Sequence, residues 1–349
     1  MSYQTYASQA GRINEIKGET LAHAVPWEVL SLGCTMKPMP KNKGDNISYR
    51  RWLPFGATTT DANTINRPSA SAAAHLLTEG VTPNADQLTP QDVNVQLLQY
   101  GCLYSYSDKA AELYEDDIPE EMKIQTGERM GLVREMIRYG ALKACTNSFY
   151  AGGSSRGTVD LAINLNFLRN ITKGLMANHT KMKTKILSPS PNYDTAAISA
   201  GYIVFAHTDL EPDIRDLEGF TPVEKYGQRK PISEHEIGSC ERFRFILSPE
   251  LGAYASSGAS VGSTGLVSTD SSNIDVYPVI VMGAEAAFDV ALRGMDSFDI
   301  THIPHTKKEK SDPLGQRGYV GASFWSAVLV PNNGWMAVGE VGVTDLSGS

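Results

Sequence analysis

Residues 117–150 read DIPEEMKIQTGERMGLVREMIRYGALKACTNSFY and carry a strong helical pattern. Apolar residues recur at steps of three and four, which places them on one stripe of a helix: Met130, Val133, Ile137, Ala141 and Ala144. The charged residues are expected on the solvent-facing side: Glu128, Arg134, Glu135, Arg138 and Lys143. There Glu135 and Arg138 form an i,i+3 pair expected to contribute roughly a few tenths of a kcal/mol. The stretch predicts one helix roughly 50 Å long, because each residue adds about 1.5 Å.

Both ends of this helix are also predicted from the sequence. Asp117 can accept a hydrogen bond from the backbone N–H three residues on, and Pro119 fits the first turn. Glu120 completes an Asp-x-x-Glu variant of the capping box. Gly152 and Gly153 are the expected stop, since glycine commonly ends helices. A rod of this length is rare in a small enzyme and indicates a protein that holds neighbours.

Four segments precede the helix. Residues 1–45 contain glycines and prolines that break longer helices, so they are expected to form an arm in which Trp27 and Leu30 anchor a short turn. Alternating apolar and polar side chains predict two pairing strands, at 46–55 and 93–100. Residues 57–90, between these strands, are rich in Thr, Ala, Asn and Pro. A loop of this length between paired strands is expected to lie on a partner's surface.

The chain after residue 150 mixes helical and strand patterns. Strands are predicted at 202–205, at 242–247 with alternating burial, and at 276–282. Helices are predicted at 161–176, 209–217 and 285–292. A Ser-, Gly- and Thr-rich loop is expected at 255–273. Strands at 324–330 and 335–341 flank Asn333 and Gly334, and Asn-Gly between apolar runs predicts a hairpin.

The composition is that of a globular protein with an excess of acid. The 349 residues are 41% hydrophobic and 20% charged, with a net charge of −8. This charge argues against a protein that condenses nucleic acid, which needs Lys and Arg against phosphates. The four cysteines are far apart and include no C-x-x-C pair, so neither a zinc site nor a disulfide framework is predicted. No secretory leader or membrane-spanning apolar run is recognised.

One cluster has the residue types of a metal site. His207, Asp209, Glu211 and Asp213 offer an imidazole and three carboxylates, which bind Zn, Mn or Mg. In the competing interpretation, Asp209 caps the helix predicted at 209–217, and the other two acids lie at its positive end. His207 then needs no special role. The second interpretation explains the acids without an ion and is favoured.

Two histidine motifs resemble parts of known sites. His302 and His305 flank Pro304, which argues against a helical pair of ligands and predicts a surface loop. The Glu-His-Glu run at 234–236 lacks the second histidine of a metalloprotease motif.

Two further runs of residues are interpreted as structural and not as binding sites. The glycine-rich run at 151–157 lacks the Lys-Ser/Thr ending of a phosphate loop and is expected to end the long helix. The basic run at 307–310 is short and is expected to be a solvated loop. We therefore expect no enzyme and no cofactor, and we assign no catalytic, cofactor-binding or metal-ligating residue.

Several short sequence motifs along the chain resemble those of a known family: Leu77-Thr-Glu-Gly-Val-Thr-Pro, Gln99-Tyr-Gly, Tyr106-Ser-Asp, Arg134-Glu, Asp216-Leu-Glu-Gly-Phe and Gly321-Ala-Ser-Phe-Trp. With the order of arm, hairpin loop, long helix, mixed middle and closing strands, the chain resembles the major capsid proteins of tailed bacteriophages. These motifs resemble those of the branch of the family named after coliphage N-four. They are recurring sequence motifs and not catalytic signatures. The resemblance covers nearly the whole chain and implies the α+β Hong Kong 97-type fold.

The resemblance implies a division of the chain: an N-terminal arm at 1–45, an extended hairpin loop at 46–100, the spine helix and first part of the peripheral domain at 101–195, the axial domain at 196–295, and the rest of the peripheral domain at 296–349. The extended loop would overlap a neighbouring subunit. Some relatives crosslink Lys to Asn beside a carboxylate, and Lys43, Asn46 and Glu79 are residues of those types. Residue types alone do not establish a crosslink, and none is predicted.

The implied function is self-assembly, through pentamers and hexamers, into the icosahedral head around a double-stranded DNA genome. The protein would be part of the virion after synthesis in the host bacterial cytoplasm, without a membrane and without sequence-specific DNA binding. Implied partners are a separate scaffolding protein, a portal and a cement protein. Two alternatives remain open: a capsid decoration or cement protein, and a metal-dependent hydrolase that uses the cluster from His207 to Asp213.

Overall fold

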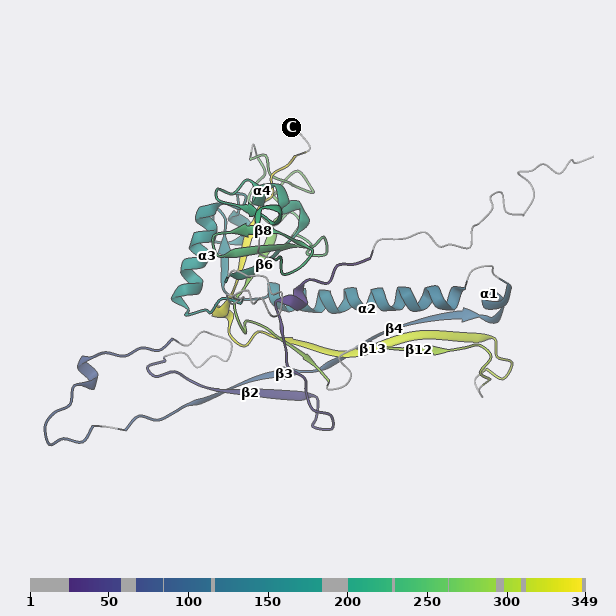
Figure 1. Ribbon diagram of the computed structural model, residues 1–349, viewed down its shortest axis with the longest axis horizontal. Helices are drawn as coiled ribbons and strands as arrows, with labels where there is room; N and C mark the ends of the chain where they lie inside the picture. Colours follow the sequence, from purple (N-terminus) through teal and green to yellow (C-terminus); the bar gives the residue numbers. More distant parts are fainter. Residues whose placement is uncertain are drawn as a thin grey trace, which may run out of the picture. The chain divides into compact units, whose positions relative to one another are not determined.

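The computed structural model describes residues 25–57, 67–83, 85–113, 117–183, 200–227, 230–262, 264–292, 298–308 and 312–346 (Figure 1). They divide into two compact units. The smaller is built from Gly101–Met130 and Asp299–Ser323, and the larger from Trp27–Tyr100, Gly131–Phe298 and Phe324–Ser349. Three elements contribute residues to both: β4 (Leu98–Ser107), α2 (Ile118–Lys143) and β13 (Arg317–Leu329). Among the described helices, none is long and apolar enough to cross a lipid bilayer.

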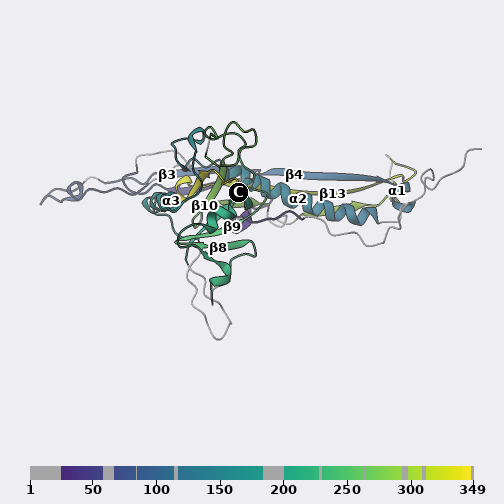
Figure 2. The same ribbon diagram turned by 90° about the horizontal axis from the view of Figure 1, so that it is seen from above.

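A seven-stranded sheet forms the centre of the larger unit (Figures 1 and 2). In spatial order its strands are β5 (Ser148–Tyr150), β14 (Met336–Val341), β10 (Tyr277–Met282), β6 (Tyr202–Ala206), β9 (Phe243–Leu247), β8 (Glu236–Cys240) and β7 (Thr221–Pro222). The pairs β5–β14 and β6–β9 are parallel, and the others are antiparallel. Every residue of β6 and β10 is buried, as their continuous apolar runs predict.

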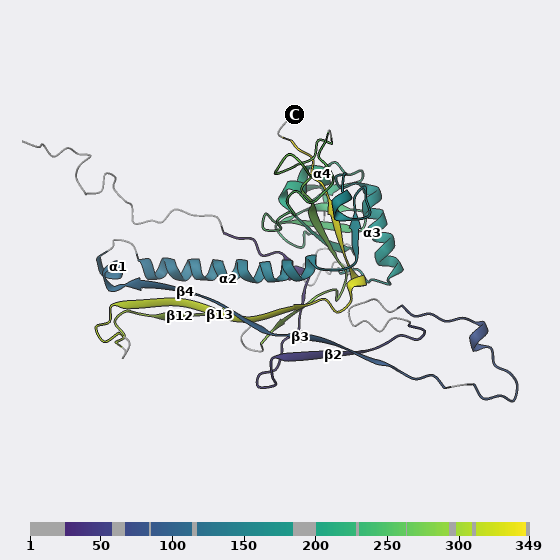
Figure 3. The ribbon, with the colours of Figure 1, turned by 180° about the vertical axis from the view of Figure 1, so that it is seen from behind.

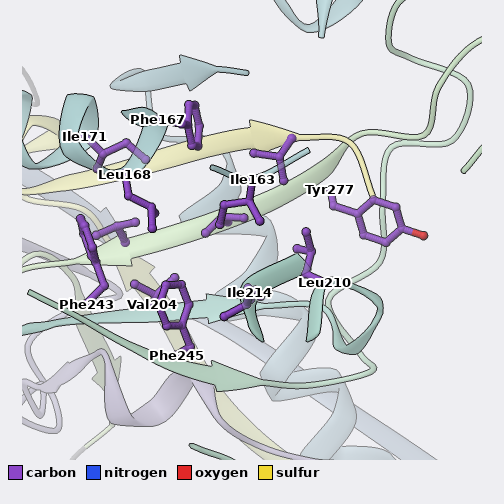
Figure 4. Packing of buried hydrophobic residues seen from close by; sticks show 14 of the residues in the cluster. Ile163, Phe167, Leu168, Ile171, Val204, Leu210, Ile214, Phe243, Phe245 and Tyr277 are labelled. Carbon is purple, nitrogen blue, oxygen red and sulfur yellow. The ribbon is translucent and has the colours of Figure 1, made fainter. Parts of the chain in front are cut away.

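One face of this sheet is covered by α3 (Leu165–Ala177) and by α4 (Glu211–Arg215) (Figure 3). The Asn164 side chain caps α3 by accepting a hydrogen bond from the N–H of Phe167 at 2.9 Å. The buried face of α3 packs with residues of the sheet such as Val204 and Phe245 (Figure 4). A helix was predicted here with a start at residue 161, and it begins later because the cap lies at Asn164.

The opposite face of the sheet is covered by the C-terminal half of α2 and by a short turn, η2 (Leu30–Leu32). Tyr139 and Leu142 of α2 pack in one buried cluster with Leu30 and with apolar side chains of the sheet. Leu30 is fully buried, so the predicted anchoring turn in the arm is confirmed at this residue. Residues 1–24 of the predicted arm lie outside the described part of the chain.

In the smaller unit, β12 (Asp299–Ile303) pairs antiparallel with β13. The unit also contains α1 (Asp108–Leu113). His302 was predicted in a surface loop, but it lies in β12, and its Nε2 atom is 2.7 Å from the Tyr106 hydroxyl. His305, which follows the strand, has its Nε2 atom 3.1 Å from a carboxylate oxygen of Glu112. The two imidazoles therefore have different polar partners, although both rings lie beside the ring of Tyr106.

The long helix begins where the sequence predicted and ends earlier. The N–H of Glu120 donates to a carboxylate oxygen of Asp117 at 3.2 Å, which confirms the cap. The helix ends at Lys143 and not at residue 150, so the glycines at 152 and 153 do not stop it. Residues 148–150 form β5 instead, because the edge of β14 accepts them as a parallel strand.

The expected helix at 285–292 is a strand, β11 (Phe288–Ala291). It pairs on one side with β1 (Thr35–Met36) and on the other with β13. Glu285 has a positive φ of 57°, which breaks a right-handed helix before it starts. The alanine-rich composition favours a helix here, but β1 and β13 provide hydrogen-bond partners for the backbone of β11 on both sides. Tertiary pairing therefore overrides the local helix propensity.

The expected closing hairpin is also wrong. β13 and β14 are strands, but β13 pairs with β11 and β12, whereas β14 pairs with β10 and β5. The Asn332 side chain accepts a hydrogen bond from the N–H of Gly334 at 3.1 Å and folds the link as a turn between two sheets. In the described part of the chain, single-turn 3₁₀ helices also occur at η3 (Ala73–His75), η4 (Arg156–Thr158), η5 (Thr208–Leu210), η6 (Val223–Lys225) and η7 (Asn333–Trp335).

Candidate assembly surfaces

A two-stranded hairpin is the main surface element of the larger unit. β2 (Asn46–Trp52) and β3 (Pro90–Gln96) pair antiparallel over their whole length, and Ile47 lies opposite Val95 (Figure 1). This pairing confirms that a strand lies on either side of the long polar segment. The strand predicted at 93–100 is divided, because β3 ends at Gln96 and residues 98–100 belong to β4. Part of that segment, residues 58–66 and 84, lies outside the described residues.

One face of the hairpin is fixed to the larger unit by apolar contacts. Ile47, Tyr49 and Val95 pack against a small core that includes the buried side chains of Met39 and Leu97. The ring of Tyr49 has its centroid 5.6 Å from that of Phe288. Burial raises the pKa of the Tyr49 hydroxyl. These contacts hold the base of the hairpin in place.

The opposite face of the hairpin is polar. Arg50 makes two hydrogen bonds to Asp92, at 2.7 and 2.8 Å, and Ser48 donates to Asn94 at 2.6 Å. The hydrogen bond from Arg50 lowers the pKa of the Asp92 carboxyl. Cross-strand pairs of this kind stabilise the register of a hairpin while leaving its outer face hydrated.

Large apolar side chains are exposed where the strands pass into the loop. Six residues have exposed fractions between 58% and 82%: Trp52, Phe55, Leu76, Leu77, Val81 and Leu88. Trp52, Phe55 and Leu88 line a hollow of roughly 830 Å³ together with small and polar loop residues. Single exposed apolar residues are ordinary, but a group of them on one extended loop indicates an interaction surface. We call these six residues the loop patch.

The buried face of α2 differs from the one predicted. Of the predicted apolar stripe only Met130 is buried, and Ala144 is exposed. Glu135 and Arg138, expected in solvent, are 0% and 2% exposed. Arg138 donates two hydrogen bonds to Asp289 of β11, at 2.6 and 2.9 Å. Sequence periodicity assigned the wrong face because two buried positions of this helix, Glu135 and Arg138, carry charge.

A second buried ion pair lies in the seven-stranded sheet. Arg244 of β9 is 2% exposed and makes two hydrogen bonds to Glu236 of β8, at 2.8 and 3.0 Å. The Tyr226 hydroxyl also donates to Glu236. The expected alternation of buried and exposed residues in 242–247 is therefore wrong, because Arg244 is buried with its apolar neighbours.

Of the four residues of the candidate metal cluster, His207 and Asp209 lie together, with 3.2 Å between Nδ1 and a carboxylate oxygen, and each of the three acids has a further partner. Asp209 accepts from the Tyr277 hydroxyl at 2.9 Å, Glu211 pairs with Arg215, and Asp213 accepts from the N–H of Thr344. No group of three or more His, Cys, Asp or Glu side chains is placed to hold a metal ion within the described ranges.

The cap at the start of this region is His207 and not Asp209. The Nδ1 atom of His207 accepts a hydrogen bond from the N–H of Asp209 at 3.1 Å. His207 is therefore the cap of η5, although the favoured sequence interpretation gave it no special role. The sequence predicted one helix over 209–217 with Asp209 as its cap. The structure has the 3₁₀ turn η5, which His207 caps, followed by the shorter helix α4 (Glu211–Arg215), so both the capping residue and the bounds differ.

The remaining sequence candidates lie apart from one another or have structural partners where they are described. Glu236 of the Glu-His-Glu run is the buried partner of Arg244. In the glycine-rich run, Arg156 makes two hydrogen bonds to Glu340 at 2.7 and 2.8 Å. Lys43 and Glu79, two of the crosslink residue types, have exposed side chains. Residues 309 and 310 of the basic run lie outside the described residues.

Sequence comparison finds a curated relative among phage proteins. The major capsid protein of Pseudomonas phage KPP21 is 20% identical over 264 residues, which cover 70% of this chain. The match spans 66% of the relative, just under two thirds of its length. No protein-family model matches the chain.

Structure comparison finds phage capsids over nearly the whole chain. The capsid of Ralstonia phage GP4 matches with a TM-score of 0.66 and 12% identity, covering 99% of this chain and 100% of its own. The capsid of cyanophage Pam1 matches with a TM-score of 0.65 and 13% identity, covering 98% of each chain. The head of Helicobacter pylori phage KHP40 matches with a TM-score of 0.55 and 12% identity, covering 98% of each chain. The chain therefore has the Hong Kong 97-type fold of tailed-phage capsid proteins.

Proposed function

We propose that this protein is a major capsid protein that assembles with itself, through pentamers and hexamers, into the icosahedral head around the double-stranded DNA of a tailed phage. The observation that carries the proposal is the loop patch, on a hairpin whose base is fixed and whose apolar side chains are exposed in the single subunit. Burying each such side chain against a neighbour would contribute about 1.5–3 kcal/mol before the costs of association. The capsid fold supplies the context for that contact.

Finer assignments belong to the same proposal. Residues 1–45 would be the arm, 46–100 the loop that overlaps a neighbour, 101–195 and 296–349 the peripheral domain, and 196–295 the axial domain. Membership of the branch named after coliphage N-four is supported by the short sequence motifs quoted above. The partners would be a scaffolding protein, a portal and a cement protein. A shell held by many modest contacts needs no catalytic residue.

The test compares assembly of the intact chain with that of a variant in which Phe55, Leu76 and Leu77 are replaced by serine. Sedimentation and negative-stain microscopy measure shells, tubes or rings, with purified scaffolding protein added if the chain alone stays monomeric. The matched control is Leu314→Ser, which alters an apolar side chain that is 73% exposed outside the hairpin. We expect the triple variant to remain folded by circular dichroism and to lose assembly, while the control assembles.

Assembly of the triple variant at the wild-type level would remove the loop patch from the interface. A compact monomer in every condition, with scaffolding protein present, would contradict the capsid function itself. Deleting residues 57–89 gives a second test of the loop, because that variant keeps every residue of β2 and β3.

A further inference from the structure

The inner face of the β2–β3 hairpin changes character between its base and its loop end. Alternate residues of β2 are partly buried: Ile47, Tyr49 and Arg51. In β3 they are paired, in the same order, with Val95, Val93 and Gln91. The face is therefore apolar near the base and polar at the end from which the loop extends.

Arg51 and Gln91 are the last pair of this inner face before the loop. The Nε atom of Arg51 donates to the side-chain oxygen of Gln91 at 2.9 Å, and its Nη1 atom donates to the backbone carbonyl of Pro331 at 3.0 Å. Burial lowers the pKa of Arg51, but an arginine keeps its charge in proteins, so both bonds are charge-assisted. One guanidinium thus joins both strands of the hairpin to the rest of the larger unit.

The carbonyl that receives Arg51 belongs to a fixed part of the larger unit. Pro331 is buried in the link between β13 and β14. The residues that follow fold back on themselves, because the N–H of Trp335 donates to the Asn332 carbonyl at 3.1 Å and the N–H of Gly334 donates to the Asn332 side chain at 3.1 Å. Arg51 is therefore bound to a firm point.

Beyond Arg51 the loop has little hold on the rest of the larger unit. Trp52, the next residue, is 58% exposed, and the hollow that it lines is formed by hairpin and loop residues alone. Farther along the loop, the Nη1 atom of Arg67 lies 3.5 Å from the Ala177 carbonyl, at an exposed position and at the outer limit of a hydrogen bond. The contact at Arg51 is thus the point from which the loop projects.

We propose that Arg51 is the positioning residue of the loop patch, because its bond to the Pro331 carbonyl fixes the angle at which the loop leaves the larger unit. Without this bond Ile47 and Tyr49 still hold the base of the hairpin, and the loop pivots about them. Thr78 lies twelve positions before Pro90, so a tilt of about 10° over a span of at most roughly 40 Å moves Thr78 by up to about 7 Å.

The consequence for assembly rests on the proposed function. A loop patch presented at one angle favours one contact geometry between copies, and therefore shells of one diameter. A loop that pivots presents the same apolar side chains over a range of angles. Arg51 then determines how uniform the shells are, whereas the loop patch determines whether copies associate.

The test measures a distance within single, unassembled copies of the full-length chain by pulsed electron spin resonance. Spin labels are attached through non-natural amino acids at Thr78 in the loop and Lys173 in α3, both of which are exposed, so the native cysteines stay in place. The main variant is Arg51→Met, which keeps an apolar stem and removes every donor. Its matched control is Arg50→Met, because that neighbouring side chain is 63% exposed and makes both of its hydrogen bonds to Asp92 within the hairpin.

We expect one narrow distance distribution in the wild type and in Arg50→Met, and a severalfold broader one in Arg51→Met. Circular dichroism and the urea unfolding midpoint show that the variants remain folded. Arg51→Lys should lie between the wild type and Arg51→Met, since an ammonium group lacks the planar fork that reaches two acceptors at once. In microscopy of assembled material, Arg51→Met should give particles of mixed diameter where the wild type gives uniform shells.

Three distance results would overturn the role of Arg51. Equal widths in the wild type and Arg51→Met would mean that the Pro331 contact does not orient the loop. Equal broadening in Arg50→Met would mean that the loss of either arginine loosens the hairpin. Equal broadening in Arg67→Ala would mean that the loop is held at α3 instead.

The two readouts separate this inference from the proposed function. Failure of the wild type to assemble under any condition would contradict the capsid function, while the distances in single copies would still decide whether Arg51 orients the loop. Uniform shells from Arg51→Met, despite a broad distance distribution, would overturn the link between loop angle and shell diameter.

Discussion

Two arginines lie in the interior of the larger unit, and each pairs with a carboxylate on another element. Arg138 of α2 binds Asp289 of β11, and Arg244 of β9 binds Glu236 of β8. Burial by itself lowers the pKa of Arg138, but Asp289 and Glu135 hold it above its ordinary value. Each pair fixes which strand or helix lies beside which, because either partner left alone would be a buried charge.

Replacing Arg244 with methionine leaves the Glu236 carboxylate buried beside an apolar side chain. We expect the free energy of unfolding to fall by about 3–5 kcal/mol, the usual cost of breaking one side of a buried pair. Urea unfolding monitored by circular dichroism measures the change. The comparison is Arg50→Met, whose ion pair with Asp92 is exposed and should matter little. Similar losses in both variants would mean that burial does not set the value of the pair.

At the scale of elements, α2 is a helix with two kinds of buried position. Tyr139 and Leu142 bury apolar surface against the central sheet. Gly131 and Glu135 contact residues 28–30 instead, and Gly131 leaves the room that the Glu28 carboxylate occupies. A single hydrophobic stripe therefore describes this helix poorly.

Two glycines of α2 separate these roles. Gly140 has no atom within 4 Å of an added Cβ, whereas a Cβ on Gly131 would lie 2.5 Å from the Glu28 carboxylate. Gly140→Ala should therefore stabilise the protein by up to about 1 kcal/mol, the ordinary helix preference for alanine. Gly131→Ala should gain less or lose stability, because it displaces Glu28 from Arg134. Unfolding midpoints in urea measure both, and equal gains would contradict the role assigned to Gly131.

Elements with their own local signal were predictable from the sequence. The strands β6 and β10, the paired strands β2 and β3, and most of α3 follow from apolar runs, alternation and helical spacing. Predictions failed where partners distant in the chain decide the outcome: β11 is a strand because β1 and β13 lie beside it.

The same reason explains the buried charges and the candidate surface. Glu135 reads as a solvated residue because its partners are backbone groups more than a hundred positions away. The length and polarity of the loop at 57–90 pointed to an interface, but neither identified Trp52, Phe55 or Leu88 as neighbours around one hollow. That arrangement requires the register of the hairpin.

For the whole molecule, the balance of charge opposes association while the loop patch favours it. The net charge is −8, so copies of the chain repel one another at neutral pH. The apolar residues of the patch lose water on contact, and salt does not weaken that gain. The rate of assembly should therefore be limited by charge repulsion between copies of the chain, and the assembled contacts should be stabilised by burial of the apolar loop patch.

Raising sodium chloride from about 0.05 to about 0.5 M shortens the screening length severalfold. We expect assembly of the purified chain, with scaffolding protein present if it is required, to become faster and more complete. Light scattering after dilution measures the rate, and microscopy checks that the products are shells and not aggregates. Slower assembly at high salt would mean that attractive ion pairs between subunits outweigh the net repulsion.

The place of β14 has a consequence for how the chain is made. This strand, Met336–Val341, lies inside the central sheet between β5 and β10, although it follows every other strand of that sheet in the sequence. The ribosome must therefore pass residue 341 before the sheet can close, and the earlier strands wait with unpaired edges. Folds that depend on pairing between strands distant in the sequence form slowly and pass through aggregation-prone intermediates. In any cell that makes this chain, chaperone capacity during synthesis would then limit how many copies reach the folded state.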